Sequence, residues 1–431
     1  MRKYARALPG HLQRFEDVVD PGLSLRQQAS NLTALLTFFL MDYGMPMVFA
    51  PQIAQSRIKR IFKEDGDRVK EQLLSLGIAL PGNKTAEMGA LMVELASSDT
   101  INAHASAQAF VAQLEARTLD PAFLQLWDRF VDEFGARCPR EIDVATPRPN
   151  EQPGLLYEQL KSMSLALDAQ KGHKTVFEEA RTKREKAYEA LHLLALQKGR
   201  RKARALARHY KTWVTLGGYR ETGKHYVIKV IDLFRKRVLK VAQTFVQAGR
   251  LDHTEQIFDL TIDDIDHALA DSALDLRALA VERTAPIDKI RKSHLVARVI
   301  DSRGKIYYPP RKEAAEGELA GVSISPGVVQ GRVKVLHHAN EKPLHPGEVL
   351  VTRATDPGWT PLFIYAGGIV LEIGGALQHG AVVAREYGIP CVSGLTGATE
   401  LLVDGQLVEV DGSNGIVRLL GEDEASQSPG G

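Results

Sequence analysis

His379 is the residue of this sequence whose type and setting best suit nucleophilic chemistry. It follows Gly374 and Gly375 by a few positions and directly precedes another glycine, so small neighbours leave its ring accessible. Imidazole is a competent nucleophile near neutral pH, because its unperturbed pKa is about 6.5. A histidine that carries a phosphoryl group fits this short pattern, and so does one that only caps or packs a helix.

The segment around His379 predicts a strand, a glycine turn, a helix and a second strand. Residues 367–372 form a short apolar run that is typical of a buried strand. Apolar residues then recur at helical spacing over 377–387, and Gly388 with Pro390 supplies a stop. His379 is thus expected in the first turn of a helix, where unpaired N–H groups and the helix dipole favour a negative group.

Composition excludes several classes of protein. The 431 residues allow two or three domains, and 44% hydrophobic residues is ordinary for a globular chain. Lys+Arg 55 against Asp+Glu 53 is too balanced for nucleic acid as the main partner. Cys138 and Cys391 form neither a disulfide framework nor a metal-ligand cluster, so we expect a cytoplasmic protein with no metal held by its own residues. The basic N-terminus lacks a signal peptide's apolar core, and no apolar stretch reaches spanning length, so no membrane partner is expected.

The chain changes character near residue 321. Helical periodicity dominates residues 1–310, whereas β-branched runs separated by glycines dominate residues 321–421. The sequence therefore predicts a mainly α-helical domain followed by a compact α/β domain. Residues 311–320 are small and charged, which is typical of a hinge linker, and residues 422–431 have the composition of a disordered tail.

The helical part carries several local predictions. Asn83 is expected to cap a helix that begins near Ala86. Continuous helices are expected over residues 102–117 and from 175 past 204. A strand is expected over residues 257–261 and a hairpin over 296–310.

The residues around His379 resemble the phosphohistidine segment of the swivelling domain in phosphoenolpyruvate synthase, pyruvate phosphate dikinase and rifampicin phosphotransferase. The resemblance rests on Gly374-Gly-x-x-x-His379-Gly-Ala-Val-Val-Ala-Arg385-Glu-Tyr-Gly-Ile-Pro390 and continues upstream in residues 321–331 and 356–361. It implies that His379 accepts a phosphoryl group, supported by Gly374, Gly375, Gln378 and Arg385. Where family members usually carry a threonine shortly before the histidine, this chain has Leu377 and Gln378.

The helical part is similar to the acceptor-binding helical domain of rifampicin phosphotransferase. This second resemblance is carried by residues 81–89, 135–143 and 219–224. Because phosphoryl transfer requires neutralisation of charge, Arg220 and Lys224 are the first candidate substrate-binding residues. Arg137 and Glu141, on a charged loop of the second resemblance, are the next candidates. From the pattern alone, Arg220 and Lys224 also fit a surface ladder with Glu221, and the loop of Arg137 and Glu141 also fits a structural ion-pair corner.

Together the resemblances imply an ATP-dependent, dikinase-type phosphotransferase that converts ATP, acceptor and water into AMP, phosphate and phosphorylated acceptor. No stretch resembles an ATP-grasp domain. Residues 218–225 match the phosphate-loop pattern except at its last position, where His225 stands in place of the required Ser or Thr. ATP and Mg²⁺ are therefore expected mainly on a separate ATP-grasp subunit, as in split phenylphosphate synthases and cresol-phosphorylating enzymes.

The expected acceptor is a small hydroxyl-bearing aromatic compound such as a phenol or cresol. The aromatic and methionine side chains of residues 38–49 are candidates for its apolar pocket, although they equally fit ordinary core packing. The alternatives are a rifamycin-type antibiotic phosphotransferase, a fragment of a phosphoenolpyruvate synthase-like enzyme, and a non-catalytic scaffold that keeps the swivelling fold.

Overall fold

The structure is a computed structural model of the chain. It describes residues 18, 20, 22–38, 41, 45–138, 140–167, 173–292, 299–307, 317–339, 341–355, 359–363, 365–375 and 378–421. The chain forms two compact units. The first comprises residues 1–43, 140–146 and 224–311, and the second comprises residues 44–139, 147–223 and 312–431.

The first unit is helical, with one small hairpin. Its elements are α2 (Leu25–Phe38), most of α12 (Arg220–Gln247), η3 (Thr254–Asp259), α13 (Ile262–Ala270), α14 (Leu276–Lys292), β1 (Val299–Ile300) and β2 (Ile306–Tyr307). A core that includes Leu25, Phe234, Phe245 and Ile265 joins the helices. The antiparallel pairing of β1 with β2 confirms the predicted hairpin.

The strand predicted over residues 257–261 is wrong. Residues 254–259 form a 3₁₀-helix, and Ile257 and Leu260 are both buried. A spacing of three places both on one face of a helical turn, whereas a strand would turn them to opposite faces. Thr261 then caps α13, because its hydroxyl accepts the N–H of Asp264 at 3.1 Å.

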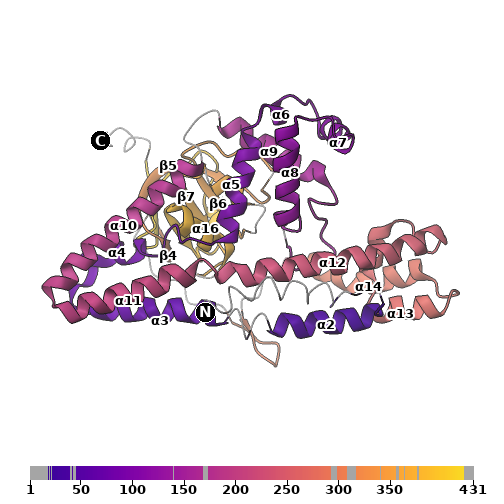
Figure 1. The fold of residues 1–431 in the computed structure, drawn as a ribbon, viewed down its shortest axis with the longest axis horizontal. Coiled ribbons are helices and arrows are strands. Elements are labelled where there is room, and N and C mark those ends of the chain that lie inside the picture. Colours follow the sequence, from indigo (N-terminus) through magenta and orange to yellow (C-terminus); the bar gives the residue numbers. More distant parts are fainter. Residues whose placement is uncertain are drawn as a thin grey trace. The chain divides into compact units, whose positions relative to one another are not determined.

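Helices also form the N-terminal part of the second unit. They are α3 (Met45–Ile61), η2 (Lys63–Val69), α4 (Lys70–Ser75), α5 (Lys84–Ala96), α6 (Asp99–Asn102), α7 (Ala107–Glu115), α8 (Pro121–Phe134), α9 (Pro153–Leu167), α10 (His173–Gln197) and α11 (Arg200–Gly217). In Figure 1, α3 and α11 lie side by side, and α10 packs on α11. The predicted cap is confirmed, because the Asn83 side chain accepts the Thr85 N–H at 2.9 Å.

Two predicted helices are interrupted. The helix expected over 102–117 is replaced by α6 and α7, because Ser98 and Ser106 each cap a separate start. The long helix expected from 175 past 204 ends at Gln197, since Gly199 has a φ of 120°, a backbone conformation outside the helical region.

The C-terminal part of the second unit is an eight-stranded mixed sheet with short helices. Its order is β3 (Glu318–Ala320), β10 (Ile416–Leu419), β9 (Leu407–Asp411), β5 (Val328–Val335), β6 (Val349–Thr352), β7 (Gly368–Leu371), β8 (Cys391–Ser393) and β4 (Val322–Ser325). The strands β5, β6, β7 and β8 are parallel to one another, and α15 (Thr360–Phe363), α16 (His379–Tyr387) and α17 (Ala398–Leu401) accompany the sheet.

The predicted fold class, a mainly helical part followed by an α/β domain, is thereby confirmed. The strands of the eight-stranded sheet begin at Glu318, because β3 pairs with β10. Residues 311–316 of the predicted linker and the predicted tail, 422–431, lie outside the described residues, so the hinge and the disorder of the tail stay predictions.

Candidate functional site

His379 is the first residue of α16, as the glycine pattern predicts. Gln378 is the N-cap in an extended conformation, and its side chain makes no capping hydrogen bond. At the other end Gly388 adopts a left-handed φ of 67°, and its N–H bonds the last turn of the helix. His379 is half-buried. The helix thus presents its positive end at His379, the arrangement that favours an anionic group.

The carboxyl ends of three parallel strands meet beside this helix. The last residues of β6, β7 and β8 are Thr352, Leu371 and Ser393, and they are paired in one row of the sheet. Open parallel sheets bind ligands at this edge, because loops and helix N-termini converge there. His379 follows β7 by a short loop, so the row places two hydroxyl-bearing residues on either side of the strand that leads to it.

Two glycines near His379 permit unusually close approaches. A Cβ atom at Gly380 would overlap the hydroxyl oxygen of Thr355, and one at Gly374 would overlap the side-chain oxygens of Gln378 and Ser393. At Gly375 a Cβ atom would meet open space. Of the two predicted supporting glycines, Gly374 therefore has a clear steric reason to be glycine.

Four buried polar atoms in this region find no hydrogen-bond partner among the described residues. They are Thr352 Oγ1, Thr355 Oγ1, Gln378 Oε1 and Ser393 Oγ. Buried polar atoms are normally satisfied, so a group of such atoms suggests a ligand position. Each of the three hydroxyls can donate to a phosphoryl oxygen. Sequence reasoning missed Thr355 and Ser393, and the available signal was their place beside the segments that carry the resemblance.

The far end of α16 contacts the helical part of the same unit. Glu386 is only 5% exposed, and its carboxylate accepts the backbone N–H of Leu80 at 2.8 Å. Burial raises the pKa of Glu386 to about 7, while hydrogen bonds from Asn83 and Leu80 and the charges of Arg220 and Arg385 oppose that rise.

Arg385, a predicted supporting residue, lies in the last turn of α16. Burial and the neighbouring charge of Arg220 lower the pKa of Arg385 to about 10, so its guanidinium remains cationic at neutral pH. Arg220 begins α12 and pairs with Glu221 at 3.3 Å. The structure therefore brings one predicted acceptor-side cation, Arg220, close to a residue of the helix that carries His379.

Lys224 and Glu141, both predicted as substrate-binding residues, form an ion pair of 2.7 Å within the first unit. The Glu141 side chain is 2% exposed, whereas that of Lys224 is 36% exposed. The charge of Lys224 therefore compensates a buried carboxylate, which is the structural ion-pair reading of this loop.

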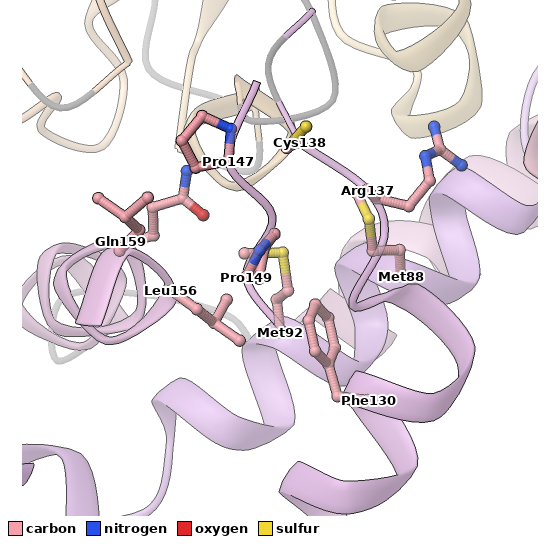
Figure 2. Close-up of a pocket in the computed structure, with 10 residues that line it drawn as sticks. Met88, Met92, Phe130, Arg137, Cys138, Pro147, Pro149, Leu156 and Gln159 are labelled. Atoms are coloured by element: carbon pink, nitrogen blue, oxygen red, sulfur yellow. The ribbon is translucent and has the colours of Figure 1, made fainter. Parts of the chain in front are cut away.

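Arg137 lines a small apolar cavity between α5, α8 and α9. Figure 2 shows Met88, Met92 and Phe130 around it, whereas the guanidinium of Arg137 points away from these side chains. The cavity has a volume of about 50 Å³. A cavity that binds benzene measures roughly 150 Å³, so in this conformation no aromatic ring fits.

The predicted apolar wall over residues 38–49 is only partly described. Met47 is buried, whereas Met45 and Phe49 are 39% and 48% exposed on α3. The side chain of Phe38 and residues 39, 40 and 42–44 lie outside the described part. Its role in binding an acceptor stays a prediction.

The described residues hold neither a metal-binding cluster nor a membrane-spanning helix. They contain no cluster of three or more His, Cys, Asp or Glu side chains arranged to hold a metal ion. Within the same residues, no helix combines the length and apolar character needed to cross a membrane.

Two family models match the chain. Residues 344–415, which include β6, β7, α16 and β8, match the mobile domain of phosphoenolpyruvate (PEP)-utilising enzymes. Residues 39–221 match the fourth domain of rifampicin phosphotransferase. The fold and the site at His379 thus define a protein of the class that carries a PEP-utilising mobile domain. We use "mobile domain" and "fourth domain" for these two ranges below.

Similar proteins agree with that assignment. A rifampicin phosphotransferase from a Streptomyces species is 32% identical over 80% of this chain and 41% of its own length. The corresponding protein of Bacillus cereus is 31% identical over 78% of this chain and 40% of its own. The prodigiosin synthesizing transferase PigC of Serratia marcescens is 30% identical over 72% of this chain and 35% of its own. The chain therefore belongs to the PEP-utilising phosphotransferase family and spans about two fifths of the length of the rifampicin phosphotransferases it matches.

Proposed function

We propose that the chain is the acceptor and carrier part of an ATP-dependent phosphotransferase in which His379 carries the phosphoryl group. The observation that supports this most is the position of His379. It begins α16 at the carboxyl edge of the parallel strands, beside four buried polar atoms without a described partner. Family membership and the match of residues 344–415 support the same chemistry.

In the first step, an imidazole nitrogen of His379 forms a bond to a phosphorus of ATP. Over the whole cycle two P–O bonds of the triphosphate break, one phosphoryl group passes to water and one to His379, and AMP leaves. Such a reaction depends on positioning and charge neutralisation. The N-terminus of α16 and the hydroxyls of Thr355 and Ser393 are the groups that we assign to hold the phosphoryl oxygens.

In the second step, the acceptor's hydroxyl oxygen bonds to that phosphorus as the N–P bond breaks. The electron pair returns to the imidazole ring, and the hydroxyl proton passes to solvent. Arg220 is our candidate for neutralising the charge that develops, because it is the predicted acceptor-side cation that lies near α16. Our proposed acceptor is a phenol or cresol.

A rifamycin is the second candidate acceptor. It is favoured by the match of residues 39–221 to the fourth domain of rifampicin phosphotransferase and by several relatives that carry that name. A panel of phenol, cresol, a rifamycin and pyruvate, scored by AMP release, separates the candidates. Preference for pyruvate would contradict both of them.

For the nucleotide we propose a separate ATP-grasp subunit that binds ATP and Mg²⁺. Residues 218–225 match a phosphate loop only in part of their sequence, and they run from the α11–α12 turn into α12. A phosphate loop instead joins a strand to a helix. This supports a nucleotide site outside these residues. The predicted linker would then let the mobile domain travel between the two sites.

The deciding experiment is the intact mass of the protein after incubation with ATP, Mg²⁺ and an ATP-grasp partner protein. We expect the mass to increase by one phosphoryl group, mapped to His379 and absent from His379→Ala. The matched control is His345→Ala, which removes an exposed histidine of the same domain. A complete lack of phosphorylation would favour the non-catalytic scaffold, and phosphorylation without the partner would contradict the separate subunit.

A further inference from the structure

A short loop of the fourth domain, residues 78–83, is held from several sides; we call it the docking loop. Ala79 has a left-handed φ of 46°, which is unfavourable for a residue with a side chain. Arg184 of α10 donates hydrogen bonds to the carbonyl oxygens of Ile78 and Ala79. At Gly218, a Cβ atom would overlap the Pro81 carbonyl oxygen, so the α11–α12 turn packs directly on the loop.

The mobile domain reaches the docking loop through Glu386. The carboxylate accepts the Leu80 N–H at 2.8 Å. The Asn83 side chain lies close enough to oppose the rise in the pKa of Glu386. Its oxygen accepts the Thr85 N–H, so its amide nitrogen is the group left to face the carboxylate.

The same two domains share further contacts. The left-handed Gly388 lies against Ile78 of the loop and Ala180 of α10. The hydroxyl of Tyr365 donates to the Met163 carbonyl oxygen at 3.2 Å. All of these contacts join the mobile domain to the fourth domain within the second unit.

We infer that Glu386 is a positioning residue, whose hydrogen bond from the docking loop holds the mobile domain against the fourth domain. The inference rests on the proposed function only where it assigns this docked position to delivery of the phosphoryl group towards the acceptor. Glu386 does not touch the reacting atoms in this scheme; it acts by fixing the helix that begins with His379.

The contact of Glu386 with the docking loop suits a mobile domain that must also separate from the fourth domain. Burying a carboxylate is costly, and its hydrogen bonds offset much of that cost. When the mobile domain departs, water can satisfy Glu386, the Leu80 N–H and Asn83 instead. An interface of apolar side chains alone would have no such compensation on release. The hydrogen bond at Glu386 can therefore be exchanged for water at little cost, beside an apolar core that the two domains also share.

The test measures the docked fraction directly, in the full chain. Spin labels are attached at Glu94→Cys, on an exposed position of α5, and at Val403→Cys, on an exposed position of the mobile domain. The two native cysteines are buried. Pulsed electron paramagnetic resonance then gives the distribution of distances between the labels.

Glu386→Ala leaves the Leu80 N–H without its acceptor, so we expect the ratio of docked to released molecules to fall roughly tenfold or more. Glu386→Gln retains an acceptor oxygen and should keep the docked distance. The matched control is Glu400→Gln, an exposed residue of α17 in the same domain. A ratio in Glu386→Ala within twofold of the parent's would overturn the inference.

A second variant covers the case in which Glu386→Ala does not fold. Asn83→Ser keeps a good helix cap but removes the amide group beside Glu386. It should lower the docked ratio a few-fold while the melting temperature remains close to the parent's. An unchanged ratio in this variant would equally overturn the inference.

The labels are read on protein that carries no phosphoryl group. Failure of His379 to become phosphorylated would therefore contradict the proposed function and leave the docking result standing. Conversely, normal phosphorylation of His379 with no change in docking would contradict only the role of Glu386.

Discussion

The hydroxyl of Thr355 lies so close to Gly380 that a Cβ atom on this glycine would overlap it. The same Cβ would come within 2.9 Å of Leu371 Cδ1. The residue after His379 must therefore be glycine for α16 to approach the carboxyl edge of the sheet. This contact ties the start of the helix to the strand ends that surround the candidate phosphoryl site.

Gly380→Ala should destabilise the protein by about 1–3 kcal/mol, because the added methyl group overpacks a buried site. It should also slow phosphorylation of His379 by displacing the start of α16. Chemical denaturation and the rate of phosphorylation measure the two effects. Gly375→Ala is the matched control, since its Cβ would enter open space. Equal stability of the two variants would contradict the close approach.

Thr355→Val and Ser393→Ala should separate stability from function. Both replace a buried hydroxyl that has no described hydrogen-bond partner, so unfolding free energies should stay equal to the parent's or rise. Phosphorylation of His379 should nevertheless slow by roughly tenfold or more, because donors to the phosphoryl oxygens are lost. A large loss of stability in either variant would show that its hydroxyl has a structural partner.

Lys224→Ala should destabilise the first unit by about 1–3 kcal/mol, because it removes a cation that compensates the buried Glu141 carboxylate at 2.7 Å. The double variant Lys224→Met with Glu141→Gln should recover most of that loss. Thermal unfolding of the single and double variants measures it. If the double variant were as unstable as the single one, the ion pair would not be the reason for the loss.

Arg220→Ala should slow transfer to the acceptor by roughly 10²-fold and leave the loading of His379 unchanged, if its charge stabilises the transfer step. Single-turnover measurements on separately phosphorylated protein distinguish the two steps. Arg129→Ala, an exposed arginine of α8, is the control. Parallel losses in both steps would point to a defect in folding or docking.

The sequence predicted correctly those features that depend on neighbouring residues. The helix that starts at His379, its glycine stop at Gly388 and the cap at Asn83 all follow from neighbouring residues, and the structure contains each of them. The break at Gly199 also depends on neighbouring residues. It was not predicted, because a single glycine within strong helical periodicity does not show that its φ is positive.

Relations across the fold were not accessible in the same way. The row of Thr352, Leu371 and Ser393 depends on the register of three strands, which the sequence pattern does not specify. Glu386 and Leu80 lie 306 positions apart, and a Glu near the end of a helix usually faces solvent. Its role emerges only when the docking loop is placed against it.

Docking of the mobile domain should weaken as pH rises from about 4.5 to about 7. The pKa of Glu386 is about 7 in the docked structure and 4.5 is its ordinary value, so within this window the docked form holds more protons than the released form. By linkage, the form that binds more protons is favoured at low pH and loses that advantage as pH rises through its own pKa. The charges that act on Glu386 are those of Arg220 of α12 and Arg385 of α16.

The two arginines keep their charge throughout this window, so the change is assigned to Glu386. The distance distribution between the labels at positions 94 and 403, recorded from pH 4.5 to 8, should show the docked fraction falling and then levelling off above about pH 7. Glu386→Gln should remove the dependence, because its amide does not titrate and still accepts the Leu80 N–H. A docked fraction that rises with pH, or an unchanged slope in Glu386→Gln, would show that another group governs the docking.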